Sequence, residues 1–229
     1  MTGHKRLLYV FLLGAATLGL ASPGRAEPFK FARIYIEYNS SARDLGYHIT
    51  LDAEDWRSLK IVNPIGKTIF DVAGRGPYRD LGMTELFFEG AEPALADFPL
   101  DQLLALFPEG EYEFTAITTG KSKLLSLATL THAVPDGPVV SAQVVASTVT
   151  IRWTLVTAPP TGFPDRPIVI AGYQIIAGTF QVTLPATRTE VTVPREYVES
   201  LGPGEHPFEV LAIEVGGNQT LTEGTFVLE

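Results

Sequence analysis

Two Gly-Lys-Ser/Thr triplets are the residues in this chain that most directly suggest chemistry, because such triplets end phosphate-binding loops. They are Gly66-Lys67-Thr68 and Gly120-Lys121-Ser122. A phosphate-binding loop also needs a glycine five residues before the triplet and a helix after it, so that backbone N–H groups can surround the phosphates. Ile61 and Thr115 occupy those positions, and strand patterns follow. We interpret both triplets as hairpin turns.

Metal-binding side chains are few and poorly spaced. Beyond residue 26 the histidines are His48, His132 and His206, and the chain has no cysteine. The sequence contains no HExxH motif and no histidine pair at ligand spacing, and LDAEDW (51–56) lacks the Asp-x-Asp-x-Asp-Gly pattern that binds calcium. We interpret 51–56 as a polar loop, and we predict no metal site and no cofactor.

Catalytic groups are equally hard to find. A pair of carboxylates can hydrolyse glycosides, and one stretch of the chain is rich in them, at Glu85, Glu89, Glu92, Asp97 and Asp101. An acidic surface accounts for these residues more simply. No Gly-x-Ser-x-Gly motif offers a serine nucleophile. We therefore predict no catalytic residue, and an acid-dependent hydrolase is the less favoured alternative.

One stretch occurs twice, as PLDQLLALFPEGEYEF (99–114) and PREYVESLGPGEHPF (194–208). Each copy has apolar residues at helical spacing, followed by Gly-Glu-(Tyr/His)-x-Phe. A β-sandwich needs such a crossing between its sheets, and a tyrosine hydroxyl bonded to the backbone just upstream stabilises it. We predict that Tyr112 makes this bond in the first copy and that His206 replaces it in the second.

The N-terminus and the charge indicate export. Residues 1–26 combine Lys5 and Arg6, an apolar stretch and a small-residue cleavage site near Ala26, which is the pattern of a secretory signal peptide. Cleavage removes three of the 17 Lys and Arg residues and none of the 26 acidic ones, so the mature charge is −12 with neutral histidines. Such a protein is repelled by nucleic acid and by anionic membranes. We predict a periplasmic or secreted protein with no stable membrane anchor.

Alternating apolar and polar residues, separated by turn residues, indicate an all-β protein. About seven strand patterns lie between residues 32 and 132, and seven more follow the Pro-rich segment AVPDGP (133–138). In the first pattern Ile34, Ile36 and Tyr38 share one face, which leaves Arg33, Tyr35 and Glu37 on the other. We predict two tandem β-sandwiches, at 27–134 and 135–229.

The segment 135–229 resembles a fibronectin type III module. The resemblance depends on the entry VPDGP, on Trp153 and Tyr173, on Leu201-Gly-Pro-Gly and on the closing strands, and it departs from the family where His206-Pro207 replaces the corner tyrosine. Residues 27–134 look immunoglobulin-like through their strand count and Tyr112. The whole chain is similar to a class of secreted bacterial proteins that join two such domains. This resemblance implies that Trp153 and Tyr173 pack in the core, and that the protein binds or scaffolds outside the cytoplasm.

Two binding functions are therefore expected, of which the favoured one is non-enzymatic binding of an envelope or extracellular protein. Loops at the end of a sandwich commonly bind, so the loop 157–167 and the neighbouring turn 216–219 are the candidate surface, with residues Phe163, Asp165, Arg166, Asn218 and Gln219. The alternative is carbohydrate binding by the first domain, with Tyr35 and Phe87 as exposed aromatic rings. The identity of the partner is left open.

Overall fold

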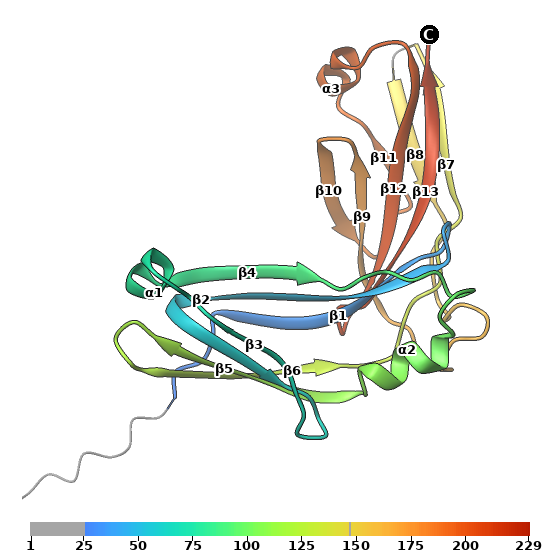
Figure 1. The fold of residues 1–229 in the computed structure, drawn as a ribbon. Helices are drawn as coiled ribbons and strands as arrows, with labels where there is room; N and C mark the ends of the chain where they lie inside the picture. Colours follow the sequence, from blue (N-terminus) through green and yellow to red (C-terminus); the bar gives the residue numbers. More distant parts are fainter. Residues whose placement is uncertain (1–25, 147) are drawn as a thin grey trace, which may run out of the picture.

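The computed structural model describes residues 26–146 and 148–229. The predicted signal peptide therefore lies, except for Ala26, outside the described residues. No helix in the described part of the chain is long and apolar enough to cross a membrane. The described chain is an all-β structure with three short helices, in which two β-sandwiches meet like the arms of an L (Figure 1).

The N-terminal sandwich contains six strands and two of the short helices. The strands are β1 (Phe31–Asn39), β2 (Asp44–Val62), β3 (Thr68–Ala73), β4 (Met83–Glu89), β5 (Gly110–Thr118) and β6 (Lys123–Leu130). The helices are α1 (Pro77–Leu81) and α2 (Leu100–Leu106). The first half of β2 pairs with β1 and β4, and its second half pairs with β3 and β5. One long strand therefore contributes to both layers.

The course of β2 corrects the interpretation of 51–56 as a polar loop. The strand continues through this segment, with irregular register between Asp52 and Trp56 and between Trp56 and Ser58. Such irregularities bend a strand, which lets β2 pass from one layer to the other. Trp56 lies at this bend and is only 1% exposed. Hydrophobic burial at the bend therefore keeps the segment folded despite its charged neighbours.

The turn between β2 and β3 forms as predicted at the first Gly-Lys-Thr triplet. The Gly66 N–H donates to the Asn63 carbonyl oxygen over 2.9 Å. Gly66 has a φ angle of 79°, a conformation that favours glycine over residues with a Cβ. The glycine of the triplet therefore shapes a hairpin.

The C-terminal sandwich consists of a four-stranded and a three-stranded sheet, a fibronectin type III-like arrangement. The orders are β10-β9-β12-β13 and β11-β8-β7. The strands are β7 (Val140–Val145), β8 (Thr148–Trp153), β9 (Ile170–Ala177), β10 (Phe180–Pro185), β11 (Glu190–Thr192), β12 (Gly204–Glu214) and β13 (Gln219–Leu228), and α3 is Arg195–Ser200. Trp153 and Tyr173 lie in the core with ring centroids 5.7 Å apart.

The two sandwiches have separate cores but share one sheet. Buried side chains of β1, β2, β5 and β6 form one cluster, and those of β8, β9, β12 and β13 form another. Between them β13 pairs in parallel with β1, with Glu37 opposite Gln219 and Asn39 opposite Leu221. The four-stranded sheet is thereby continuous with β1, β2, β5 and β6. The placement of the domain boundary between residues 134 and 135 stays a prediction.

Candidate functional site

The loop 157–167, expected to bind a partner, lies against the N-terminal sandwich. The Phe163 ring lies 4.8 Å from the Tyr38 ring of β1, measured between centroids. Arg166 Nη2 lies 2.6 Å from Glu109 Oε2. Asp165, which lies between Phe163 and Arg166 in the sequence, is exposed. Phe163 and Arg166 therefore contact the chain's own first domain. Among the predicted residues of this loop, only Asp165 remains exposed without such a contact in the described structure.

Asn218 is a structural residue at the same junction, which corrects its expected place on an exposed loop. Its side chain is buried, with 1% exposure. Its Oδ1 accepts a hydrogen bond from the Ile36 N–H (2.9 Å), and its Nδ2 donates to the carbonyl oxygens of Thr131 (2.9 Å) and Ala133 (3.1 Å). Gly217 and Asn218 of the turn 216–219 are buried, whereas Gly216 is exposed. The pairing of β13 with β1 brings the buried end of this turn against the N-terminal sandwich. Gln219, the next residue, donates to the Glu37 carboxylate.

Tyr35 and Phe87 lie on the outer face of the layer formed by β1, β2 and β4, on either side of His48. The Tyr35 ring stacks on the His48 ring, with 4.9 Å between the centroids. The Arg33 guanidinium lies over the Tyr35 ring, 4.0 Å from its centroid. Tyr35 is only 8% exposed, in contrast to the exposed ring expected from strand alternation, because these neighbours cover it. Phe87 is 58% exposed and 5.8 Å from His48.

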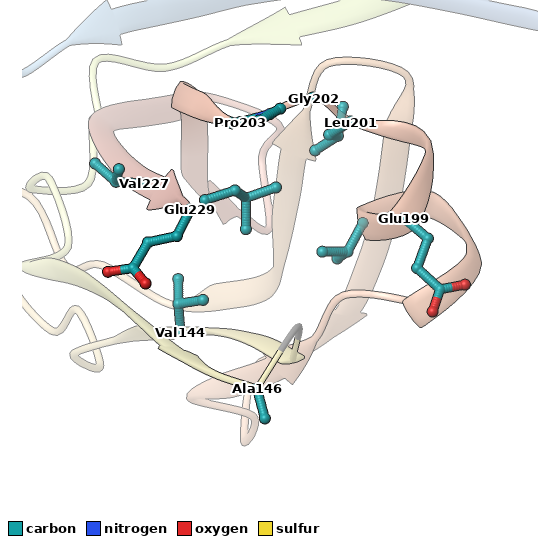
Figure 2. Close-up of a pocket in the computed structure, with 10 residues that line it drawn as sticks. Val144, Ala146, Glu199, Leu201, Gly202, Pro203, Val227 and Glu229 are labelled. Atoms are coloured by element: carbon teal, nitrogen blue, oxygen red, sulfur yellow. The ribbon is translucent and has the colours of Figure 1, made fainter.

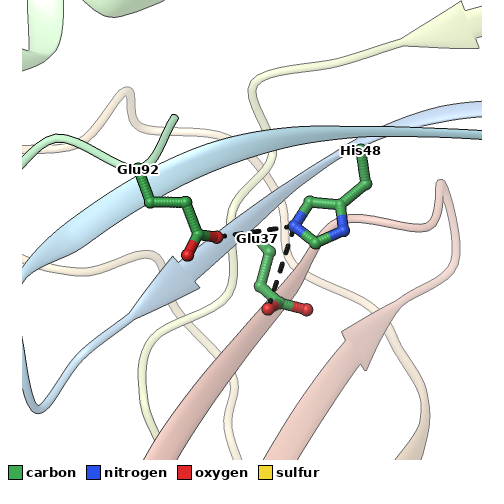
Figure 3. Close-up of side chains that lie close together, drawn as sticks. All are labelled: Glu37, His48 and Glu92. Carbon is green, nitrogen blue, oxygen red and sulfur yellow. Dashed lines mark ion pairs between the residues drawn. The ribbon is translucent and has the colours of Figure 1, made fainter. Parts of the chain in front are cut away.

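Three carboxylates surround His48, a cluster that the sequence analysis missed (Figure 3 shows His48, Glu37 and Glu92). His48 Nε2 lies 3.5 Å from Glu92 Oε1 and 3.9 Å from Glu37 Oε1, and Nδ1 lies 3.8 Å from Glu89 Oε2. Gly46, opposite Glu37 in the strand pairing, makes the cluster possible, since a Cβ there would lie 2.6 Å from the Glu92 side chain.

Several acidic side chains lie close together around this cluster. Burial raises the pKa of Glu92, and the negative charges of Glu37 and Glu89 raise it further, while His48 partly offsets them. On β12, burial and the charges of Glu223 and Glu37 raise the pKa of Glu209. Positive charge is therefore favoured where β1, β2 and the segment after β4 meet.

A second candidate site is an apolar pocket of about 420 Å³ in the N-terminal sandwich. It is lined by Tyr47, Ile49, Ile69, Phe70, Phe88, Gly90, Ala91, Pro93, Phe98, Leu103, Leu106 and Phe107. Phe70 and Phe88 stack at 4.4 Å, and Tyr47 and Phe107 stack at 4.0 Å. The Tyr47 hydroxyl donates to the Leu103 carbonyl oxygen over 3.0 Å, and burial raises its pKa.

The sequence positions beside the pocket are acidic. Asp71, Glu89, Glu92 and Asp97 each adjoin a lining residue, and no Lys or Arg does. Glu85 lies farther along β4, and Asp101 lies in the first turn of α2. The acidic residues considered for a hydrolase thus include Glu89 and Glu92 of the His48 cluster, and catalysis by them stays a less favoured prediction.

A larger recess of about 620 Å³ lies at the end of the C-terminal sandwich away from the junction (Figure 2). Glu199, Leu201, Val227 and Glu229 are among its lining residues. It also includes Ala146, which adjoins residue 147, outside the described residues. We assign no site there.

Comparisons with known proteins identify no family. No protein-family model and no curated protein matches the chain. Solved structures with low similarity include the Clostridium perfringens spore cortex lytic enzyme, with 14% identity and a TM-score of 0.34 over 41% of this chain and 28% of that one. They also include fibronectin(III)-like modules of Clostridium thermocellum CbhA, with 13% identity and a TM-score of 0.27 over 89% of this chain and 90% of that one. A tandem repeat of a large adhesion protein has 11% identity and a TM-score of 0.28, over 87% and 50%. The chain thus spans 28% of the lytic enzyme's length and half of the adhesion repeat's.

Proposed function

We propose that this chain is an exported, non-enzymatic binding protein of the cell envelope or the cell exterior. We propose further that the apolar pocket of its N-terminal sandwich holds a hydrophobic side chain of a basic partner polypeptide. The observation that supports this most directly is the pocket itself, whose lining is almost entirely aromatic and aliphatic. Apolar concave sites with few polar groups are typical of ligand-binding surfaces.

The polar chemistry of the pocket favours binding over catalysis. Tyr47 is the one lining residue with an ionisable side chain, and its hydroxyl already bonds to Leu103. A tyrosine hydroxyl is neutral at physiological pH, and burial raises the pKa of Tyr47 further. The lining residues thus offer no general acid or base. Burial of a ligand's apolar surface against them would contribute about 25 cal/mol of binding free energy per Å².

The net charge of the chain favours a basic polypeptide over an anionic lipid. The chain beyond residue 26 has a net charge of −12, and no Lys or Arg lines the pocket. This field attracts a cationic segment and repels a fatty-acid carboxylate or a phospholipid head group. A lysine- or arginine-rich segment with one large apolar side chain therefore fits both the pocket and the charge of the chain.

Labelled peptides test this proposal with the chain from Glu27 onward, which contains both hydrophobic cores. One peptide alternates lysine with phenylalanine, a second replaces lysine with glutamate, and a third replaces phenylalanine with alanine. Fluorescence anisotropy should show binding of the first peptide alone. Ala91→Trp, which fills the exposed mouth of the pocket, should weaken binding at least tenfold, whereas Ala171→Trp on an exposed position of β9 should not. Equal binding of all three peptides, or by both variants, would contradict the proposal.

A second candidate, carbohydrate binding, is favoured by a different recess on the outer face of β1, β2 and β4. Phe31 and Phe87 are 47% and 58% exposed there, and Asp52 and Glu85 also line the recess. Aromatic rings that stack on sugars, beside carboxylates that accept hydroxyl hydrogen bonds, suit a saccharide. A glycan array should then show binding that Phe31→Ala and Phe87→Ala each remove. An array without signal for the unsubstituted chain would eliminate this candidate.

A further inference from the structure

His48 is a buried histidine whose ring nitrogens lack hydrogen-bond partners in the described structure. It is 4% exposed, and both Nδ1 and Nε2 are inaccessible to solvent. Buried polar groups are nearly always satisfied, so an unpaired one calls for an unseen ion or water, or for a functional role. Since Glu37 and Glu92 direct carboxylate oxygens toward Nε2 (Figure 3), a bound cation fits this position.

The spacing of these atoms suits one small ion. Zinc binds imidazole nitrogen and carboxylate oxygen at about 2.0–2.2 Å, so two ligand atoms of a tetrahedral site lie about 3.3–3.5 Å apart. Nε2 lies 3.5 Å from Glu92 Oε1 and 3.9 Å from Glu37 Oε1. One ligand atom from each of the three residues lies within 4.8 Å of the others. The two carboxylate oxygens would complete the coordination by moving a few tenths of an ångström toward Nε2 and somewhat more toward each other.

We propose that Glu37, His48 and Glu92 form a binding site for a divalent transition-metal ion such as Zn²⁺. The imidazole distinguishes this site from calcium and magnesium sites, which use oxygen ligands. Three protein ligands leave a fourth position for water. Glu89 Oε2, 3.8 Å from Nδ1, is placed to accept the Nδ1 proton after a small movement, as carboxylates commonly do behind metal-binding histidines.

The strands position the three ligands without the ion. Tyr35 pairs with His48 and Glu37 with Gly46, so the pairing of β1 and β2 fixes His48 next to Glu37. Gln219 holds Glu37 Oε2 by a hydrogen bond, which leaves Oε1 for the site. The absence of a side chain at Gly46 gives Glu92 its place. Sequence spacing alone could not reveal this site, because its carboxylates come from different segments.

Charge also favours a cation at this point. Glu37, Glu89 and Glu92 carry three negative charges around one imidazole, and Glu209 lies close enough to Glu37 to be affected by its charge. A divalent ion would offset two of these three charges and connect β1, β2 and the segment after β4. Because Gln219 of β13 holds Glu37, the ion would also stabilise the junction between the sandwiches.

Isothermal titration of the chain from Glu27 onward, without a histidine tag and after chelator treatment, tests the proposal. We expect one Zn²⁺ ion to bind per chain at micromolar or lower concentration, and the melting temperature to rise. Ca²⁺ at the same concentration should have no comparable effect. His48→Gln and Glu92→Gln should each weaken Zn²⁺ binding at least 30-fold, whereas the matched control Glu85→Gln, on the same face of the sheet, should not.

Nuclear magnetic resonance of the histidine rings keeps the test decisive if a variant fails to fold. The unsubstituted chain beyond residue 26 has three histidines, His48, His132 and His206. Zn²⁺ should shift the Nε2 resonance of His48 and leave the other two rings unchanged. Absence of Zn²⁺ binding, or binding that shifts His132 or His206 but not His48, would overturn the proposal.

Discussion

His206 Nε2 lies 2.8 Å from the carbonyl oxygen of Gly202, four residues earlier in the chain. Tyr112 makes the equivalent contact in the other sandwich, where its hydroxyl donates to the Pro108 carbonyl oxygen over 3.0 Å. Both follow a short helix and lie near the start of a strand, β5 or β12. The repeated sequence stretch therefore builds the same corner twice, with a different ring in each copy.

The two corners should differ in their contribution to stability. Tyr112→Phe removes the hydroxyl from a fully buried ring, so we expect the free energy of unfolding to fall by about 1 kcal/mol. His206→Phe keeps the ring beside Phe226 but exposes the Gly202 carbonyl to water, so it should cost less. Urea unfolding of both variants measures the difference. A larger loss for His206→Phe would contradict the assignment of the main corner bond to Tyr112.

Asn218→Ala should be among the most destabilising polar substitutions in the chain. It leaves the Ile36 N–H and the Thr131 and Ala133 carbonyl oxygens unpaired at a buried position. Each buried polar group left without a partner costs about 1–3 kcal/mol. We therefore expect a total loss of about 3 kcal/mol in chemical unfolding. Gln181→Ala, on an exposed position of β10, is the matched control and should change stability little.

Phe163→Ala should loosen the junction without disrupting either core. The ring packs on Tyr38 across the two sandwiches, so its removal should cost about 1–2 kcal/mol. Small-angle X-ray scattering should then show a broader distribution of interatomic distances. Leu155→Ala, on an exposed side chain of the same sandwich, serves as the control. An unchanged distribution for Phe163→Ala would show that β13–β1 pairing alone fixes the arrangement.

The Arg166–Glu109 ion pair predicts an acid-dependent contribution to stability. The Arg166 hydrogen bond, above all, holds the pKa of Glu109 below its ordinary value of 4.5, with help from the His132 backbone N–H and from the charges of both residues. Because the folded pKa is lower than the unfolded one, the contribution is complete above the unfolded pKa and disappears as pH falls through the folded pKa.

Thermal unfolding of the unsubstituted chain and Glu109→Gln from about pH 6 to about pH 3 measures this effect. The unsubstituted chain should be slightly more stable at the higher pH, and the difference should shrink toward the acid end. The effect should be small because both side chains are partly exposed. A difference that grows on acidification would exclude this ion pair as its source.

The fold class could be predicted from local patterns, because each depends on neighbouring residues in the chain. Alternation placed Ile34 and Ile36 in the core, and the helical spacing of Leu103 and Leu104 indicated a short helix with a buried side. The burial of Trp153 and Tyr173 followed from the family resemblance and their apolar neighbours. These features need no knowledge of which strands pair.

The sites could not be predicted because they depend on strand pairing and on the junction. His48 and Glu37 lie 11 positions apart in sequence, and only the register of β1 with β2 brings them together. Phe163 and Asn218 are residue types that occur on binding surfaces, but Phe163 packs on Tyr38 and Asn218 is buried beside the parallel pairing of β13 with β1. Tyr35 alternates correctly onto the outer face and is nevertheless covered by Arg33 and His48.

The parallel pairing of β1 with β13 has a consequence for the order in which the chain folds. Residues 37–39 find their partners only at 219–221, so the free edge of β1 must wait until nearly the whole described chain is available. Contacts so distant in sequence form slowly, and unpaired strand edges promote aggregation. The N-terminal sandwich is thus made first but completed last, and a chaperone that shields β1 during this interval would raise the yield of correctly joined protein.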